Sequence, residues 1–231
     1  MFRNREFTSN VYWGGLLLAW AYSCYAAQPL YNYSDRTLAD LRTLLRDEDH
    51  QKRSCAAYFI GVRYRNPHVV MVGGPLIASN SPKPELPIPV RLVEELSNLL
   101  TNDNHSEVRT SALIALGRIK YYSDTSRIIE KALTDTNVFI RLSAAGELIE
   151  IHKSYNEPLA TNVVNAILDC IDKSQDPEVL WISAFRLGCL GGEANRAIPW
   201  LERLAEHRDD YVRRRAIEAL QKIRPRKSEK R

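Results

Sequence analysis

The sequence predicts an all-α protein built from about five stacked two-helix repeats, a fold of the α-solenoid class. Two observations support this prediction. The segment from Val108 to Ile119 has apolar residues at helical spacing, which gives one apolar stripe, at positions 108, 112, 115, 116 and 119. Similar helices recur at 52–61, 140–149, 179–188 and 212–223. A single helix of this kind cannot bury its own apolar stripe. We therefore expect the helices of neighbouring repeats to pack together and to bury one another's stripes.

The elements follow from helix start and stop signals along the chain. We expect a first helix over 36–46, capped by Asp35 or Ser34, and a core helix from about His50 to Arg65. Further helices are expected at 90–100, 107–121, 125–133, 138–152, 159–172, 177–190, 194–206 and 210–223. Pro158 stands where a helix starts, and Gly191-Gly192 is expected to end the helix 177–190.

The repeat spacing is regular except at one place. The aligned core positions 52, 108, 140, 179 and 212 are separated by 56, 32, 39 and 33 residues. The first interval is long because a proline-rich insertion, residues 66–89, follows the first core helix and contains Gly73-Gly74. This insertion is interpreted either as a binding loop or as a disordered segment.

The two ends of the chain differ from the repeat region, which spans 28–223. Residues 1–27 have a basic start, the 17 uncharged residues 11–27 and small residues at their end, which is typical of a signal peptide cut after Ala26. Two alternatives stay open: an uncleaved membrane anchor over 11–27, or lipid attachment at Cys24. Residues 224–231 form a charged, mainly basic tail. A periplasmic or secreted location is therefore expected.

Composition and cysteines restrict the function classes. The chain has 231 residues, 45% hydrophobic and 26% charged, with a net charge of +4, which indicates a folded globular chain and does not by itself indicate nucleic acid. We interpret Cys55, Cys170 and Cys189 as small core residues. Cys170 and Cys189 would lie at different heights on antiparallel helices, about 16 Å apart along the axis, too far for a disulfide.

A recurring pair of charged residues identifies the type of repeat. An aspartate stands six residues before an arginine at Asp47 and Arg53, at Asp103 and Arg109, and at Asp135 and Arg141. Together with the VR-x-x-A-x-x-A-L-G run of 108–117, this pattern resembles HEAT repeats in the short form of phycobilisome-lyase-like arrays. The resemblance covers about 36–223. It implies that such side chains link turns of adjacent repeats. The fourth repeat departs from it, because Leu180 replaces the arginine and Asp176 is too close.

Candidate binding residues are aromatic and basic side chains on the second helices, which in such an array line a concave face. Trp, Tyr and Arg are favoured at the energetic centres of interfaces. For Trp181, core burial is the alternative interpretation. The predicted partner-binding set is Trp181, Arg186, Arg214, Arg118, Tyr121 and Tyr122.

The sequence gives no indication of catalysis. The five histidines do not cluster with one another or with cysteines, and no phosphate loop, nucleophile elbow or Cys/His pair is present. We therefore expect no cofactor, no metal and no enzymatic activity. An enzyme of the HEAT type, a lyase or hydrolase, is the alternative from a different class.

The predicted function is binding of another protein, in the secretory or periplasmic space. Two roles fit a small exported array: an inhibitor or immunity protein that neutralises a toxin, or an assembly factor for an envelope complex. Nucleic acid is not expected as a partner, because an exported protein seldom meets it. The chain could also attach to a membrane, through residues 11–27 or through a lipid on Cys24.

Overall fold

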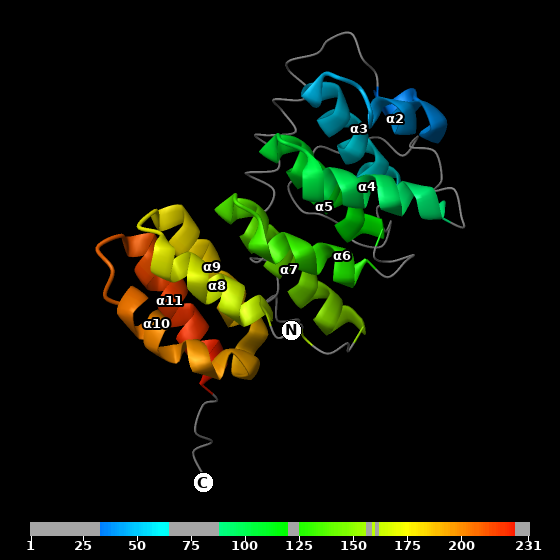
Figure 1. Ribbon diagram of the computed structural model, residues 1–231. Coiled ribbons are helices and arrows are strands. Elements are labelled where there is room, and N and C mark those ends of the chain that lie inside the picture. The colour runs from blue at the N-terminus through cyan, green and yellow to red at the C-terminus, as the bar shows by residue number, and fades with distance from the viewer. Residues whose placement is uncertain (1–32, 65–87, 120–124, 156–158, 160–161, 225–231) are drawn as a thin grey trace, which may run out of the picture. The chain divides into compact units, whose positions relative to one another are not determined.

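A computed structural model describes residues 33–64, 88–119, 125–155, 159 and 162–224 (Figure 1). All regular elements in these ranges are helices, which confirms the predicted all-α, α-solenoid fold class. The chain divides into two compact units, Met1–Ser123 and Asp124–Arg231. Within the described ranges, no helix has both the length and the apolar character needed to cross a membrane. The expected signal segment, the insertion over 66–87, and the charged tail from 225 lie outside the described residues.

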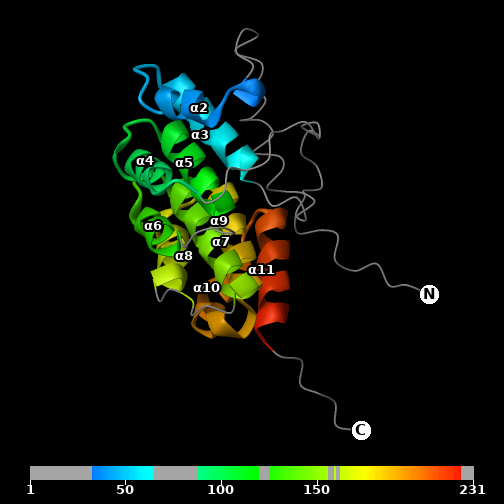
Figure 2. The ribbon, with the colours of Figure 1, turned by 90° about the vertical axis from the view of Figure 1, so that its right-hand side faces the viewer.

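The described residues of the first unit form two helix pairs. They are α2 (Leu38–Leu44) with α3 (His50–Arg63) and α4 (Val90–Asn102) with α5 (Ser106–Ile119), preceded by the short η1 (Tyr33–Asp35). The predicted stripe of α5 is fully buried at Val108, Ala112, Ala115, Leu116 and Ile119. The second helices α3 and α5 pack against each other and lie side by side in both views (Figure 2). Neighbouring repeats therefore bury one another's stripes, as the periodicity predicts.

The second unit contains three helix pairs. They are α6 (Ser126–Lys131) with α7 (Val138–Tyr155), α8 (Asn162–Lys173) with α9 (Pro177–Leu190), and α10 (Ile198–Leu204) with α11 (Asp210–Ile223). Two 3-10 segments, η2 (Ala132–Thr134) and η3 (Gly191–Ala197), extend the first helices of their pairs. The second helix α9 contacts α7 on one side and α11 on the other. The second helix of the middle pair therefore packs against the second helices of both neighbouring pairs.

Local capping sets the helix ends. Thr37 begins α2 with a capping box: its Oγ1 accepts from the backbone N–H of Asp40, and its own N–H donates to that carboxylate. The expected cap at Asp35 or Ser34 is therefore wrong by two to three residues. Asp176 and Pro177 start α9, and Gly191 ends it at φ +59°, a left-handed backbone that favours glycine.

An arginine early in the second helix holds the turn inside four of the five repeats; the fourth repeat has Leu180 instead. In α3, Nη1 of Arg53 donates to the carbonyl oxygens of Asp47 and Glu48, both at 2.8 Å. Arg109, Arg141 and Arg213 make the same pair of bonds to the residues six and five before them. The turn residue accepts from the backbone N–H two positions later, at Asp47, Asp103, Asp135, Ser174 and His207. Serine and histidine thus replace the aspartate in the last two repeats, and Asp176 and Asp209 are helix caps instead.

One of these arginines also joins two repeats. Nε and Nη2 of Arg53 donate to the two carboxylate oxygens of Asp103 at 2.7 and 3.1 Å. The Asp103 side chain is only 5% exposed, so this bidentate pair is largely desolvated. The link between adjacent turns that the resemblance implies is present here, between two largely buried side chains.

Small residues let second helices approach closely. A Cβ atom on Gly61 of α3 would lie 2.9 Å from Cα of Ala115 in α5, and one on Gly188 of α9 would lie 3.0 Å from Cα of Ala219 in α11. Glycine and alanine thus occupy equivalent positions at both contacts. Close backbone approach at these points fixes the spacing of the second helices in each unit.

Candidate functional site

The candidate site is a group of aromatic and arginine side chains on α9 and α11, in the second unit. We call it the α9/α11 patch and define it as Trp181, Phe185, Tyr211, Arg214 and Arg215. Its rings are half-buried, and its residues come from two successive repeats. All belong to one compact unit, so their mutual geometry is fixed by the packing of α9 on α11.

Tyr211 lies at the centre of the patch. The ring of Trp181 meets the ring of Tyr211 edge to face, with centroids 5.2 Å apart. The guanidinium carbons of Arg214 and Arg215 lie 5.5 and 5.0 Å from the Tyr211 ring centroid. Trp181 therefore packs against the next repeat and also borders the surface, so the core interpretation and the binding interpretation each describe part of its surroundings.

Arg215 is held in one orientation by four contacts. Its Nη2 donates to the Tyr211 hydroxyl and its Nη1 donates to Glu218 Oε2, both at 2.8 Å. Its guanidinium also lies over the rings of Tyr211 and Phe185. Partial burial lowers the pKa of Arg215, but the hydrogen bonds that it donates to Tyr211 and Glu218 raise the pKa by more, so the net pKa lies above its ordinary value. Arg215 is a fixed, permanently charged group at the surface of the patch.

Arg186 follows Phe185 in α9 and is 8% exposed. Its guanidinium occupies the space that a side chain on Gly146 would fill: a Cβ there would be 2.4 Å from Cζ of Arg186. In the other two close contacts, the position equivalent to Arg186 is occupied by alanine, at positions 115 and 219. Arg186 of the fourth repeat thus fits because Gly146 of the third repeat has no side chain. It also lies 5.7 Å from the Phe185 ring centroid.

Burial raises the free energy of the charged form of Arg186. It lowers the pKa of Arg186 to about 10, and Cys189, Glu147 and Glu150 offset only part of this effect. The group remains charged at neutral pH, at a cost on the order of 3 kcal/mol relative to water, since each pKa unit corresponds to about 1.4 kcal/mol. Strongly perturbed groups of this kind concentrate at functional sites.

The other predicted residues have different positions. Arg214 is 63% exposed and pairs with Asp210, with Nε and Oδ2 3.0 Å apart. Arg118 lies near the end of α5 in the first unit and is half-buried. Tyr121 and Tyr122 lie outside the described residues. Sequence reasoning missed Tyr211 and Arg215, although the tyrosine stands four residues before the arginine, the spacing at which side chains meet on a helix.

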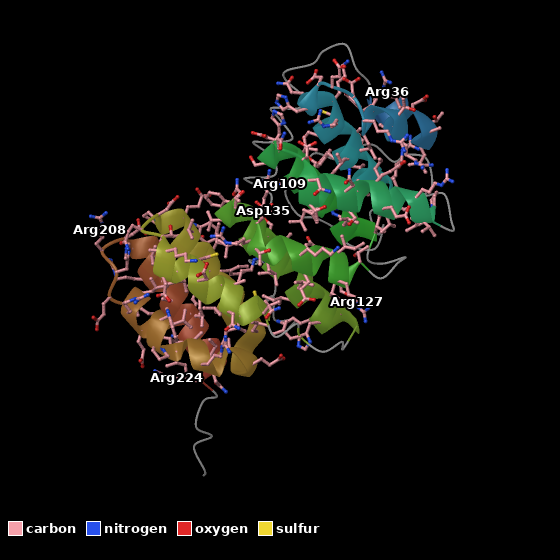
Figure 3. The ribbon with its side chains drawn as sticks, in the orientation of Figure 1. Arg36, Arg109, Arg127, Asp135, Arg208 and Arg224 are labelled. Carbon is pink, nitrogen blue, oxygen red and sulfur yellow. The ribbon has the colours of Figure 1, made fainter. Side chains whose placement is uncertain are left out.

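Charges vary along the surface of the second unit. The segment Asp210 to Arg224 carries five basic side chains against Asp210 and Glu218. Arg208 and Arg224 mark the two ends of α11 (Figure 3). Arg224 pairs with Glu202 of α10. On the other side of α9, Glu147 and Glu150 of α7 are close enough to act on Arg186. The α11 side is therefore the basic side of the patch.

The described cysteines and acidic groups do not form an obvious reactive centre. Cys55 and Cys170 are buried, as predicted, whereas Cys189 is partly exposed, so its assignment to the core was only partly right. Burial raises the pKa of the Cys170 thiol, and nearby Arg141 lowers it by less. Among the described residues, no group of three or more His, Cys, Asp or Glu is placed to hold a metal ion.

Comparisons with known proteins agree with this fold. The family model described as HEAT repeats matches residues 164–230. Crystal structures of two engineered proteins from the Northeast Structural Genomics Consortium are also similar. One is 24% identical, with a TM-score of 0.51, and 80% of this chain aligns with 78% of that chain. The other is 19% identical, with a TM-score of 0.55, and 87% of this chain aligns with 92% of that chain. A comparison with curated proteins found no significant match.

These likenesses define the class of protein. At this level of identity the engineered structures support the fold alone, and the family match supports HEAT repeats in the part of the chain that holds the α9/α11 patch. The fold is therefore that of an α-solenoid, and residues 164–230 match HEAT repeats. The narrower likeness to phycobilisome-lyase-like arrays stays a prediction.

Proposed function

We propose that this protein is a non-enzymatic binding module that docks another protein on the α9/α11 patch. The observation that carries the proposal is the grouping of Trp181, Tyr211 and Arg215 on one surface, next to the exposed Arg214. Tryptophan, tyrosine and arginine are the side chains enriched where binding energy concentrates. The Arg215 guanidinium is already fixed by its neighbours, so little side-chain entropy remains to be lost on binding.

Photo-crosslinking in the native host tests this proposal. An apolar photoreactive amino acid, which keeps the hydrophobic character of the side chain, replaces exposed Ile217 beside the patch on α11, and in a matched protein it replaces Arg127 on α6. We expect one stoichiometric partner at position 217 and not at position 127. Arg214→Ala should reduce the crosslink at least tenfold, whereas Arg203→Ala on α10 should leave it unchanged. Equal labelling from both positions would refute docking on the patch.

We further propose that the chain acts outside the cytoplasm. The support is the layout of residues 1–27: a basic start, an uncharged segment and a small-residue end. Mass spectrometry of the protein from its host should find a mature start near Ala27. An intact Met1 in the exported fraction would favour a membrane anchor, and a mass increase on Cys24 would favour a lipoprotein.

Two biological roles fit such a module. An inhibitor or immunity protein would bind a toxic enzyme tightly and abolish its activity, and an assembly factor would bind one component of an envelope complex. The crosslinked partner distinguishes them. Inhibition of a purified partner enzyme supports the first role, and loss of the assembled complex on deletion of this protein supports the second.

A further inference from the structure

We propose that the segment bound by the α9/α11 patch is acidic, with an apolar residue between its carboxylates, and that it lies against the α11 side. This inference rests on the proposed function and adds the chemical class of the partner. Three features of α11 support it: its excess of basic side chains, the weak pairing of Arg214, and the exposed Ile217.

The first feature is a positive charge held in place. Arg215 is fixed by Tyr211, Phe185 and Glu218, so its position does not depend on the partner. Arg213 and Arg214 both pair with the single carboxylate of Asp210, at 2.8 and 3.0 Å. Two cations that share one anion leave a local positive excess, which attracts carboxylates.

The second feature is that Arg214 can change partners at little cost. Both members of its pair with Asp210 are more than 60% exposed. Exposed pairs of this kind contribute about 0–1 kcal/mol. A carboxylate from a bound segment, placed in the partly desolvated surroundings of the Tyr211 ring, would form a stronger hydrogen-bonded pair than the one it replaces.

The third feature is an apolar side chain among these charges. Ile217 is 44% exposed, and Val90 in the other unit is the one other large hydrophobic residue that is exposed in the described part of the chain. Ile217 stands three residues after Arg214, so the two side chains are neighbours on the helix surface. A segment that combines an acidic and an apolar side chain matches this arrangement.

The same features argue against nucleic acid. Binding to a phosphate backbone requires several basic groups that are not matched by acids. Here Asp210 and Glu218 occupy both ends of the Arg213–Arg215 group. A continuous line of phosphates would meet both acids, whereas a single carboxylate needs only the exposed Arg214.

Fluorescence anisotropy with the full-length protein tests the inference. The probes are a labelled peptide of alternating Glu and Leu, its Gln and Leu counterpart, and a labelled thymidine oligonucleotide. We expect the Glu peptide to bind at least tenfold tighter than the Gln peptide, and tighter than the oligonucleotide. Arg214→Glu and Ile217→Asn should each weaken Glu-peptide binding at least fivefold, while Arg203→Glu on α10 should change it less than twofold. Circular dichroism checks that each variant is folded.

Other outcomes overturn the inference in distinguishable ways. Equal binding of the Glu and Gln peptides would remove the acidic preference, and tighter binding of the oligonucleotide would replace it with nucleic acid. If the crosslink at position 217 yields a partner peptide without Asp or Glu, the inference falls and the docking proposal stands. If position 217 yields no partner at all, the docking proposal falls as well.

Discussion

Arg186 was predicted to bind a partner, but its contact with Gly146 gives it a different role in the folded protein. The sequence offered Arg186 as a partner-binding residue, but the side chain is buried beside Gly146, with its guanidinium 5.7 Å from the Phe185 ring centroid. Little of its surface is therefore open to a partner. The two residues are forty positions apart, and only the packing of α9 on α7 reveals that they share one space.

This shared space gives a prediction with opposite signs in two backgrounds. In the wild type, Gly146→Ala should destabilise the protein by about 1–2 kcal/mol, because the new methyl group displaces a buried guanidinium. In an Arg186→Ala background the same change should stabilise by up to about 1 kcal/mol, since alanine is the better helix former. Urea unfolding of the four proteins measures both effects. The same sign in both backgrounds would contradict the packing described here.

Asp103 gives a residue-scale prediction about pH. Burial raises its pKa, but the hydrogen bonds from Arg53 and the N–H of His105 lower it more, so the net pKa is below its ordinary 3.8. A carboxylate whose pKa is lowered in the folded state adds stability above its unfolded pKa and loses it as the pH falls through the folded pKa.

Asp103→Asn should therefore reduce the free energy of unfolding at pH 7 by about 2 kcal/mol, the value of hydrogen bonds to a charged group. The gap between wild type and variant should close as the pH falls below about 4. Urea titrations at pH 7, 4.5 and 3 check this, with Glu48→Gln as an exposed control. A gap that stays constant down to pH 3 would show that the Asp103 charge is not its source.

At the scale of helices and turns, the contact between the repeat of α7 and the repeat of α8 lacks one element of the pattern. Arg141 binds its own turn as Arg53 does, yet its Nε is buried without a hydrogen-bond acceptor among the described residues. The corresponding Nε of Arg53 binds Asp103, the turn residue of the repeat that follows Arg53; the turn residue of the repeat that follows Arg141 is Ser174. Asp176, which the sequence placed too close to fit the pattern, is a helix cap.

Replacing this serine should complete the pattern. Ser174→Asp is expected to raise the free energy of unfolding by about 1 kcal/mol, because it supplies a carboxylate to a buried donor. Ser174→Asn is the matched control, since it keeps the turn acceptor and adds no charge, and it should be close to neutral. Thermal unfolding at low and high salt compares them. No gain from the aspartate over the asparagine would mean that Arg141 does not reach this turn.

At the scale of the whole molecule, each compact unit has its own core and its own close contact between second helices. Stability in a repeat array is carried mainly by contacts between neighbouring repeats. We therefore expect the effect of a packing change to be strongest near the repeat in which it is made.

Gly188→Ala should speed amide hydrogen exchange in α9 and α11, because its methyl group would lie 3.0 Å from Ala219. Helices α3 and α5 of the first unit should exchange as in the wild type. Gly192→Ala is the control, since nothing lies within 4 Å of its added Cβ, and it should change neither region. Mass spectrometry of the exchanged protein resolves these segments. Equal acceleration in both units would indicate one cooperative core.

The sequence by itself determined the fold class, the helix boundaries at α9 and α11, and the buried stripe of α5. These depend on local signals, namely periodicity, the Asp-Pro start and the glycine stop, which act over a few residues and can be read along the chain. It also provided Trp181 and Arg214 as candidates without showing that they meet at Tyr211.

Only the tertiary structure decided which side chains form a surface and which are buried beneath it. The α9/α11 patch joins residues of two repeats, and the burial of Arg186 depends on an absent side chain in a third. Such contacts depend on how closely the helices pack. Periodicity is a property of short segments, and a short segment does not show which distant residues come together when the helices pack.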